Sequence, residues 1–344
     1  MSPQITFKSN PSRTAAPGEA LTDSAGRPVA PAQTLAQALR PEYVPSHGKA
    51  PDRLPPAPYG VSDLGPAAAL RVIGPDREAW MQGMQSADVS ATSMGGAVAG
   101  LFLGGKGRLV AEGLVWRFPD ELIVTTLPER LDALHEHLDK LLIMEDCELS
   151  RADGLHRLRF APGPEPLDRL HDVAGAMQPL GLELLVTPDR AKELLAALPA
   201  ADPAQVEAWR VAIGVPAWGS ELDVETTPVD AGLDREISFT KGCYVGQEVV
   251  AMATYRGRVA WNLVRLQLDG RAPPPGARLD PSRPAQGKRG TVTSVTQVGD
   301  VAVMLGYVHK ELVVPGSGVA VEDGRTATVL GLPYGSLPGA GVCA

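Results

Sequence analysis

An eight-residue segment, Lys241 to Glu248, concentrates side chains that can do chemistry. It reads Lys-Gly-Cys-Tyr-Val-Gly-Gln-Glu and sets a cation, a thiol, a phenol, an amide and a carboxylate around two glycines. Two glycines four residues apart suggest a backbone that must bend or that is approached closely. Lys241 can stabilise the thiolate of Cys243 if both side chains face the same way. Gln247 and Glu248 match the donors and acceptors of an amide-bearing heterocycle. The alternative is a structural turn, although turns favour Asn, Asp and Ser.

The aromatic and sulfur groups of this region allow more than one role. Cys243 is a candidate nucleophile or redox thiol, a ligand for a transferred metal centre, or a buried packing group. The histidines closest to it in sequence are His171 and His309, so a local Cys–His pair has no support. Tyr244 and Trp218 could form the walls of a site for a flat heterocycle, or they could be core aromatics.

Residues 237–248 resemble the signature of the YgfZ-type folate-binding proteins, which are relatives of the aminomethyltransferase (T-protein) of the glycine cleavage system. The resemblance extends over roughly residues 60–335. Further segments match in the family's order: Gly74-Pro75-Asp76, Trp80-Met81-Gln82-Gly83, Asp88-Val89, Lys106-Gly107-Arg108-Leu109, Trp218-Gly219-Ser220-Glu221, Thr227-Pro228, Ala231-Gly232-Leu233 and Tyr255-Arg256-Gly257-Arg258.

The resemblance implies that tetrahydrofolate is bound. It also implies a role in assembling or repairing iron–sulfur clusters in client enzymes, among them radical enzymes that modify tRNA. A concave, mostly apolar pocket is expected near where the α+β units meet a C-terminal β-domain. Lys241, Gln247, Glu248 and Arg256 are expected to converge there, with the two cations pairing with the glutamate carboxylates of the folate. Tyr244 and Trp218 are the expected walls of this pocket.

Three departures from the relatives bear on activity. Ala212 stands where the transferases have a folate-contacting glutamate, and Glu112 stands where they have a critical aspartate. Glu112 keeps the charge but is one methylene longer, so it is a candidate catalytic residue whose alternative is an exposed strand carboxylate. Met252 replaces an arginine found in many family members.

Two other functions therefore stay open besides folate-dependent support of cluster assembly. One is a folate-dependent aminomethyl or one-carbon transferase, which Ala212 and Glu112 argue against. The other is a non-enzymatic scaffold that has lost the ligand, against which the intact segment 241–248 argues. Whether the protein is an enzyme is left open by the sequence, as are its oligomeric state and the role of Cys243.

The composition limits the classes of protein. The chain has 344 residues, enough for two or three domains, and 44% of them are hydrophobic. A net charge of −8 argues against a general nucleic-acid surface. Three cysteines without a C-x-x-C pair disfavour a dedicated metal site and fit a reducing compartment. Because no apolar run reaches membrane-spanning length, we expect a cytoplasmic protein without a membrane partner.

The pattern along the chain predicts an α+β protein. Residues 1–58 are rich in Pro and Ala and are expected to be a disordered tail with one short helix near Leu35–Leu39. Residues 59–258 are the expected aminomethyltransferase-like α+β region, 259–335 a β-domain, and 336–344 a tail. Two strand–Thr–helix segments begin at Asp120 and Glu183, which predicts two pseudo-repeated units that, by the resemblance, pack around a central opening.

Local signals place the ends of the helices. Thr126 and Glu129 have capping-box spacing, whereas Thr187 and Pro188 suit the N-cap and the first helical position. A third helix is expected from Asp202 to Gly214, burying Val206, Trp209 and Ile213. Strands at 261–268, 290–298 and 301–308, with a hairpin at 318–330, predict a C-terminal antiparallel β-barrel or sandwich.

Overall fold

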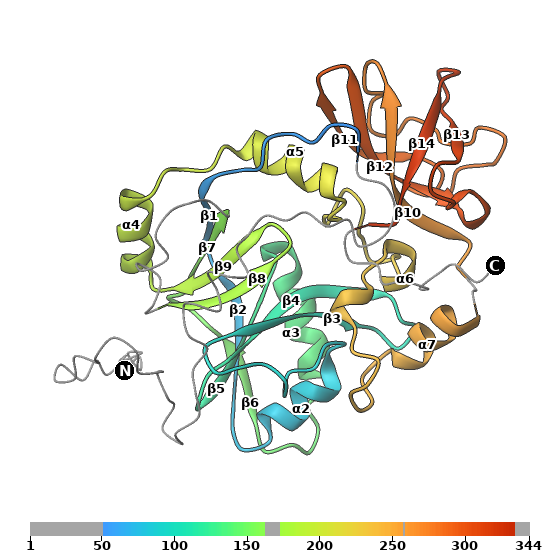
Figure 1. Cartoon of the computed structure of the whole chain (residues 1–344). Coiled ribbons are helices and arrows are strands. Elements are labelled where there is room, and N and C mark those ends of the chain that lie inside the picture. Colours follow the sequence, from blue (N-terminus) through green and yellow to red (C-terminus); the bar gives the residue numbers. More distant parts are fainter. Residues whose placement is uncertain (1–50, 162–172, 257–258, 334–344) are drawn as a thin grey trace.

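The computed structural model describes residues 51–161, 173–256 and 259–333, except for the side chains of Tyr255 and Arg256. Helices and strands form two α+β units and a C-terminal sheet, and all three sheets are antiparallel (Figure 1). Most of the predicted tail, its short helix and the segment 336–344 lie outside the described residues. Within the described part, no helix has the length and apolar character needed to cross a membrane.

The first α+β unit is a five-stranded sheet in the order β3-β4-β5-β2-β6, with α2 and α3 packed against one face. Leu134 and Leu138, one helical turn apart in α3, are fully buried there, as the apolar spacing predicts. The elements are β2 (Ala68–Ile73), α2 (Arg77–Met84), β3 (Ala97–Leu103), β4 (Leu109–Arg117), β5 (Glu121–Thr126), η1 (Pro128–Arg130), α3 (Leu131–Asp139) and β6 (Glu148–Arg151).

The second unit is a four-stranded sheet in the order β1-β7-β9-β8, with α4 packed against it. Thr187 caps α4 by accepting a hydrogen bond from the Arg190 N–H at 3.4 Å, and Pro188 is its first residue, as predicted. The elements are β1 (Gly60–Pro66), β7 (His156–Ala161), β8 (Ala174–Gln178), β9 (Gly181–Val186) and α4 (Pro188–Ala197).

The capping box predicted for the first unit is wrong. The Thr126 hydroxyl donates to the backbone oxygen of Glu112 at 2.6 Å, across the sheet. A short 3-10 turn, with Leu127 at its N-cap and no side-chain cap, precedes α3 instead. Local spacing fails here because a tertiary hydrogen bond takes the hydroxyl.

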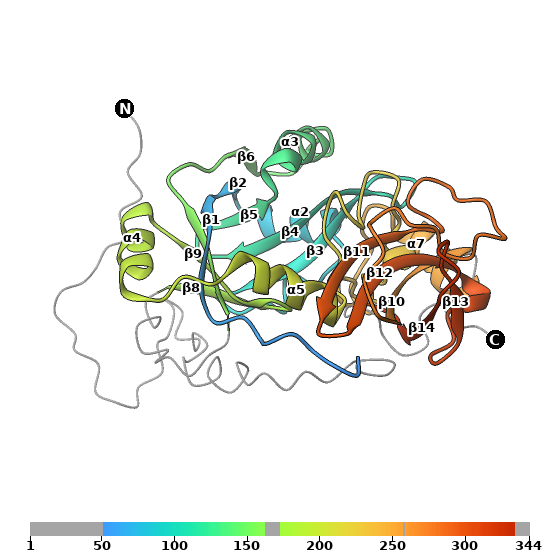
Figure 2. The same cartoon turned by 90° about the horizontal axis from the view of Figure 1, so that it is seen from above.

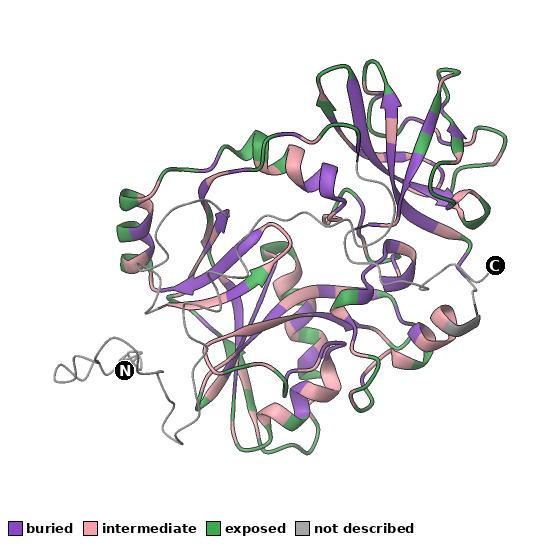
Figure 3. Ribbon diagram, viewed as in Figure 1, coloured by how far each residue is buried: buried purple, intermediate pink, exposed green. Residues whose placement is uncertain are grey.

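The two sheets pack on each other through a buried cluster that includes Trp116, Leu114, Ala176 and Leu185. Strands β3 and β8 lie next to each other at this contact. Burial is concentrated on the strands, whereas the outer faces of α3 and α4 are exposed (Figure 3). The fold class predicted from the sequence, with two α+β units, is confirmed.

Helix α5 connects these units to the C-terminal sheet. It is capped by Asp202 and ends at Gly214 in the left-handed conformation, as predicted. Its fully buried residues are the last four, Arg210 to Ile213, while Val206 and Trp209 are only partly buried. The remaining elements before the sheet are α5 (Pro203–Ile213), α6 (Pro228–Ala231), η3 (Asp234–Glu236) and α7 (Gln247–Arg256).

A buried ionic network joins α5 to this sheet. Arg210 Nη1 lies 3.0 Å from Glu221 Oε2, and its Nη2 donates to Ser294 Oγ at 2.9 Å. Ser294 in turn donates to Glu221 Oε1 at 2.6 Å, and the Ala217 N–H donates to Glu221 Oε2 at 2.9 Å. The Glu221 carboxylate is fully buried and thus depends on these donors.

The C-terminal sheet has the order β11-β12-β10-β14-β13. Its edge strands β11 and β13 do not pair with each other in the described chain, so the predicted barrel is an open sheet. Seen from above, this sheet and α4 lie at opposite ends of the molecule (Figure 2). The predicted domain limits stay predictions. The elements are β10 (Trp261–Asp269), β11 (Val292–Val298), β12 (Val301–His309), η4 (Lys310–Leu312), β13 (Gly318–Ala320) and β14 (Thr326–Gly331).

Candidate functional site

Lys241 attaches the 241–248 segment to the last turn of α2 and to the chain that follows it. Its Nζ donates to the backbone oxygens of Gln82 at 2.7 Å and Ala87 at 2.8 Å, and to that of Gln85. These three carbonyls use all three ammonium donors. The ammonium also lies 5.0 Å from the centroid of the Tyr244 ring, and burial lowers the pKa of Lys241 to about 8. Lys241 therefore holds its own loop in place, and its predicted contact with a ligand stays a prediction.

Only one of the two glycines in the segment is required by the backbone. Gly246 has a φ of +84°, and a Cβ there would lie 2.8 Å from Leu103 Cβ and 3.0 Å from the Gly104 oxygen. No side chain fits at this close approach between α7 and the end of β3. At Gly242 a Cβ would meet open space.

The polar residues at the end of the segment differ in exposure and in their partners. Cys243 is exposed with a free thiol, and Glu248 is exposed at the start of α7. The amide oxygen of Gln247 has a partner within the segment, because Oε1 accepts a hydrogen bond from the Tyr244 N–H at 3.4 Å. The catalytic role predicted for Cys243 stays a prediction.

The two aromatic residues pack in a hydrophobic cluster. Tyr244 is 8% exposed, and burial raises the pKa of its phenol to about 12. Trp218 packs against the same cluster, with the Arg130 guanidinium 4.6 Å from its ring centroid. Tyr244 is thus a core aromatic, whereas Trp218 is partly buried, and their role as the walls of a ligand site stays a prediction. The side chain of Arg256 lies outside the described residues.

The three described side chains have different surroundings. Lys241 is held by backbone carbonyls, Gln247 Oε1 accepts from a backbone N–H, and Glu248 lines neither of the two cavities described below. The partners of Lys241 come from residues 82–87, about 160 positions earlier in the chain. That Lys241, Gln247, Glu248 and Arg256 converge on one pocket stays a prediction.

Glu112 lies on β4 and is partly buried. It stands opposite Leu101 of β3 and so faces the same side of the sheet as Ala97 and Ala99. Burial, together with the neighbouring Glu236 carboxylate, raises the pKa of the Glu112 carboxyl to about 8. The alternative of an exposed strand carboxylate is wrong, whereas the catalytic role stays a prediction.

Glu236 is the second carboxylate, and sequence reasoning missed it. It lies in η3, where the Ser86 hydroxyl donates to its backbone oxygen at 2.5 Å. Its Oε2 is buried, and no described group donates a hydrogen bond to it. Burial raises the pKa of Glu236 to about 7. One signal was available, since Glu236 lies between the apolar Leu233 and Ile237, both of which are buried.

A cavity of about 420 Å³ opens beside Glu236. The alanines of β3 leave room there, because larger side chains on that face would fill the space between β3 and the β8–β9 turn. The lining residues are Ala97, Val98, Ala99, Met177, Gln178, Pro179, Arg235 and Glu236. This cavity, the β3–β8 cavity, thus has small apolar walls and one carboxylate with a buried oxygen atom, with Glu112 on the same face of the sheet and the exposed Arg235 also lining it.

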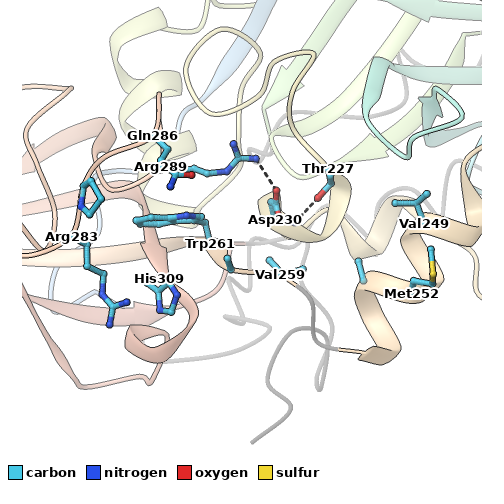
Figure 4. Close-up of a pocket in the computed structure, with 13 residues that line it drawn as sticks. Thr227, Asp230, Val249, Met252, Val259, Trp261, Arg283, Gln286, Arg289 and His309 are labelled. Carbon is cyan, nitrogen blue, oxygen red and sulfur yellow. Dashed lines mark hydrogen bonds and ion pairs between the residues drawn. The ribbon is translucent and has the colours of Figure 1, made fainter.

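A second cavity of about 740 Å³ lies between α6, α7 and the C-terminal sheet, and we call it the α6–β10 cavity (Figure 4). It occupies the place where the sequence predicted a pocket, but α7 contributes Val249, Met252 and Ala253 rather than the residues of the 241–248 segment. The other lining residues are Thr227, Asp230, Val259, Ala260, Trp261, Arg283, Pro284, Gln286, Arg289 and His309.

Comparisons with known proteins agree on the relationship, although no family model matches the chain. A putative chloroplastic transferase of Arabidopsis thaliana is 25% identical, over 80% of this chain and 71% of the relative. The tRNA-modifying protein YgfZ of Aliivibrio fischeri is 24% identical, over 60% and 70%. A mitochondrial iron–sulfur cluster assembly factor homologue of Neurospora crassa is 22% identical, over 62% and 55%.

The fold is similar to a solved structure of the glycine cleavage system aminomethyltransferase T from Bartonella henselae. That structure covers 94% of both chains, with a TM-score of 0.64 and 18% identity. The protein therefore has the fold of the aminomethyltransferases. The relatives add a more particular likeness: in sequence the chain is similar to YgfZ-type proteins and to an iron–sulfur cluster assembly factor.

Proposed function

We propose that the protein binds tetrahydrofolate in the β3–β8 cavity and supports the assembly or repair of iron–sulfur clusters in client enzymes. The proposed role in iron–sulfur cluster assembly or repair is supported by relatives that are named for tRNA modification and for iron–sulfur cluster assembly. The folate part rests on the kinship with aminomethyltransferases. Client enzymes that modify tRNA, and a cytoplasmic location, belong to the same proposal.

One observation carries the choice of cavity, and it is the pair of partly buried carboxylates Glu112 and Glu236. The Glu236 Oε2 atom is buried, and no group in the described part of the chain donates a hydrogen bond to it, which is costly unless a bound group supplies one. The amino and ring N–H groups of a pterin are such donors. The donor set of a folate thus fits the residues present.

The roles of the individual residues follow from their positions. Glu236 would accept from the pterin N–H groups, and the alanines of β3 would leave space for the ring. Arg235 would be the cation for a folate carboxylate. With pKa values of about 7 and about 8, Glu236 and Glu112 hold at least one proton between them near neutral pH. When bound, tetrahydrofolate would supply a carrier for one-carbon units.

Calorimetric titration of reduced tetrahydrofolate tests this proposal. We expect wild type to bind, and Glu236→Gln to bind about tenfold or more weakly, because the acceptor is replaced by an amide. Glu248→Gln is the matched control, since it makes the same substitution at an exposed carboxylate outside the cavity. It should leave binding unchanged, as should Cys243→Ser.

Two results would count against the proposal. Absence of binding to wild type would refute the folate site and favour the scaffold function. Binding that is lost in Glu248→Gln but kept in Glu236→Gln would place the ligand at the 241–248 segment instead.

One observation favours a second candidate, the one-carbon transferase. A carboxyl group with a pKa of about 8, as Glu112 has, can give or take a proton at neutral pH. Turnover of a lipoyl-bound aminomethyl substrate by the pure protein, lost in Glu112→Gln, would establish this activity. The same assay without turnover would leave folate binding as the function of the pair.

A further inference from the structure

The loop that joins α3 to β6 exposes two adjacent large apolar side chains to solvent. Ile143 is 79% exposed and Met144 is 90% exposed, the highest values among the large hydrophobic residues in the described part of the chain. Figure 1 shows that this loop lies at the edge of the first unit away from the C-terminal sheet. Single exposed apolar residues are common on soluble proteins, whereas a neighbouring pair on a projecting loop indicates a surface that contacts a partner.

Residues 143–146, which we call the 143–146 tip, are held in one conformation although they are exposed. The N–H groups of the first two residues of the tip both donate to Glu145 Oε2, at 3.2 and 3.1 Å. These hydrogen bonds, the one from Met144 most of all, lower the pKa of the Glu145 carboxyl, so that it stays ionised. On either side of the tip, Leu142 and Cys147 pack against the core of the first unit. A partner therefore meets a preorganised tip, which reduces the entropy lost on binding.

Exposed carboxylates surround the tip. They lie on the loop, at its two ends or in contact with it, and none forms a salt bridge with a residue in the described ranges: Asp76, Asp139, Glu145, Asp146 and Glu148. The cations beside them have other partners, since Lys140 is paired with Glu136 at 2.6 Å and Arg77 donates to backbone oxygens. This charge repels anionic lipid headgroups and nucleic acid, and it is complementary to a cationic protein surface.

We propose that the 143–146 tip is the docking surface for client enzymes and that it inserts into an apolar pocket with a cationic rim. The inference rests on the proposed function, under which the clients include enzymes that modify tRNA. An enzyme that binds tRNA presents Lys and Arg to the phosphates, and aromatic side chains on which unpaired bases stack. Its RNA-binding face therefore has both features that the tip complements, so the tip and tRNA compete for it.

Biolayer interferometry of the full chain tests this inference, with purified tRNA-modifying radical iron–sulfur enzymes of the same organism immobilised one at a time. The double variant Ile143→Ser/Met144→Ser removes the apolar side chains of the tip. Val224→Ser/Val314→Ser is the matched control, because these valines are 49% and 59% exposed and lie outside the tip. Since all four side chains are exposed, both variants should fold like wild type.

We expect at least one of these enzymes to bind wild type and the valine variant alike, and to bind the tip variant about tenfold or more weakly. Asp139→Asn/Glu148→Gln should lower the association rate and make it less sensitive to salt. Saturating tRNA should displace wild type from the enzyme. Failure of every enzyme to bind wild type, equal binding of the tip variant and wild type, or binding that tRNA does not weaken would overturn the inference.

Two other occupants of the tip would also overturn the inference. Binding of wild type, but not of the tip variant, to vesicles of phosphatidylglycerol and phosphatidylcholine would make the tip a membrane contact. A wild-type dimer in sedimentation velocity that the tip variant loses would make it a contact between two copies of the chain.

The cluster content of a damaged client enzyme separates this inference from the proposed function. The client is supplied with iron, sulfide and a thiol reductant, with and without the protein. A gain in cluster content that is equal for wild type and the tip variant would overturn the inference and leave the proposed function standing. Docking through the tip without such a gain would support the inference and count against the role in cluster repair. Tetrahydrofolate binding should be equal in wild type and the tip variant, because the tip lines neither cavity.

Discussion

Replacing Glu236 by Gln should stabilise the protein, and the gain should grow with pH. Burial raises the Glu236 pKa from 4.5 to about 7, so between these two pH values the folded state holds a proton that the unfolded state has lost. The stability that this proton contributes is fully present below pH 4.5 and is lost as pH rises through about 7. The neutral amide of the introduced glutamine removes this dependence.

The size of the effect follows from the two pKa values. Their difference, about 2.5, corresponds to roughly 3 kcal/mol at about 1.4 kcal/mol per pH unit. Because the Glu112 carboxyl titrates in the same range and repels Glu236, the gain at alkaline pH is expected between about 2 and 4 kcal/mol. Near pH 4 both carboxyls are protonated in the folded state, and the variant and wild type should have nearly equal stability.

Urea unfolding, followed by circular dichroism at about pH 4 and at about pH 9, measures this difference. Subtracting the wild-type free energy of unfolding from that of the variant at each pH cancels the titration of all other groups. Glu248→Gln, at an exposed carboxylate, should change stability by less than about 0.5 kcal/mol at both pH values. A Glu236→Gln gain that is the same at both pH values, or a loss at about pH 9, would show that Glu236 is not desolvated as described.

Two further substitutions test the packing that positions the site. Arg210→Met should lower the free energy of unfolding by about 3–5 kcal/mol, because it leaves the fully buried Glu221 carboxylate without its guanidinium. Adding Glu221→Gln to Arg210→Met should restore part of that loss. Urea unfolding of the single and double variants measures this coupling, and strictly additive free energies of unfolding would contradict the reasoning. Gly246→Ala should cost about 2 kcal/mol or more, since its Cβ would lie 2.8 Å from Leu103 Cβ at a φ of +84°. Gly242→Ala should cost less than about 0.5 kcal/mol, and equal thermal stability of the two variants would contradict the assignment.

Local signals predicted the elements of the fold where their partners are local. Thr187 and Pro188 begin α4, and Asp202 and Gly214 bound α5, because caps depend on residues within a turn of the helix end. Thr126 shows the limit of such signals. Its hydroxyl bonds across the sheet to Glu112, a contact that depends on how β4 and β5 pair and that no local spacing encodes.

The site was harder to predict for the same reason. The types of the residues in the 241–248 segment suggested a ligand, but the partners of Lys241 come from residues 82–87. The partly buried carboxylates that the structure brings together, Glu112 and Glu236, lie on a strand and a short 3-10 turn far apart in sequence. Neither residue stands out in the sequence by its neighbours or spacing. The packing of η3 against β3 brings the two carboxylates close together.

The three carbonyls around Lys241 also determine the stiffness of the surface near it. The exposed loop that carries Cys243 is held at one end by Lys241 and at the other by Gly246, which is wedged against the end of β3. A loop of this length that is fixed at both ends has few accessible backbone conformations. When a molecule binds at Cys243, little conformational entropy is thus lost in ordering the loop. The binding affinity is then determined by the contacts between that molecule and the loop.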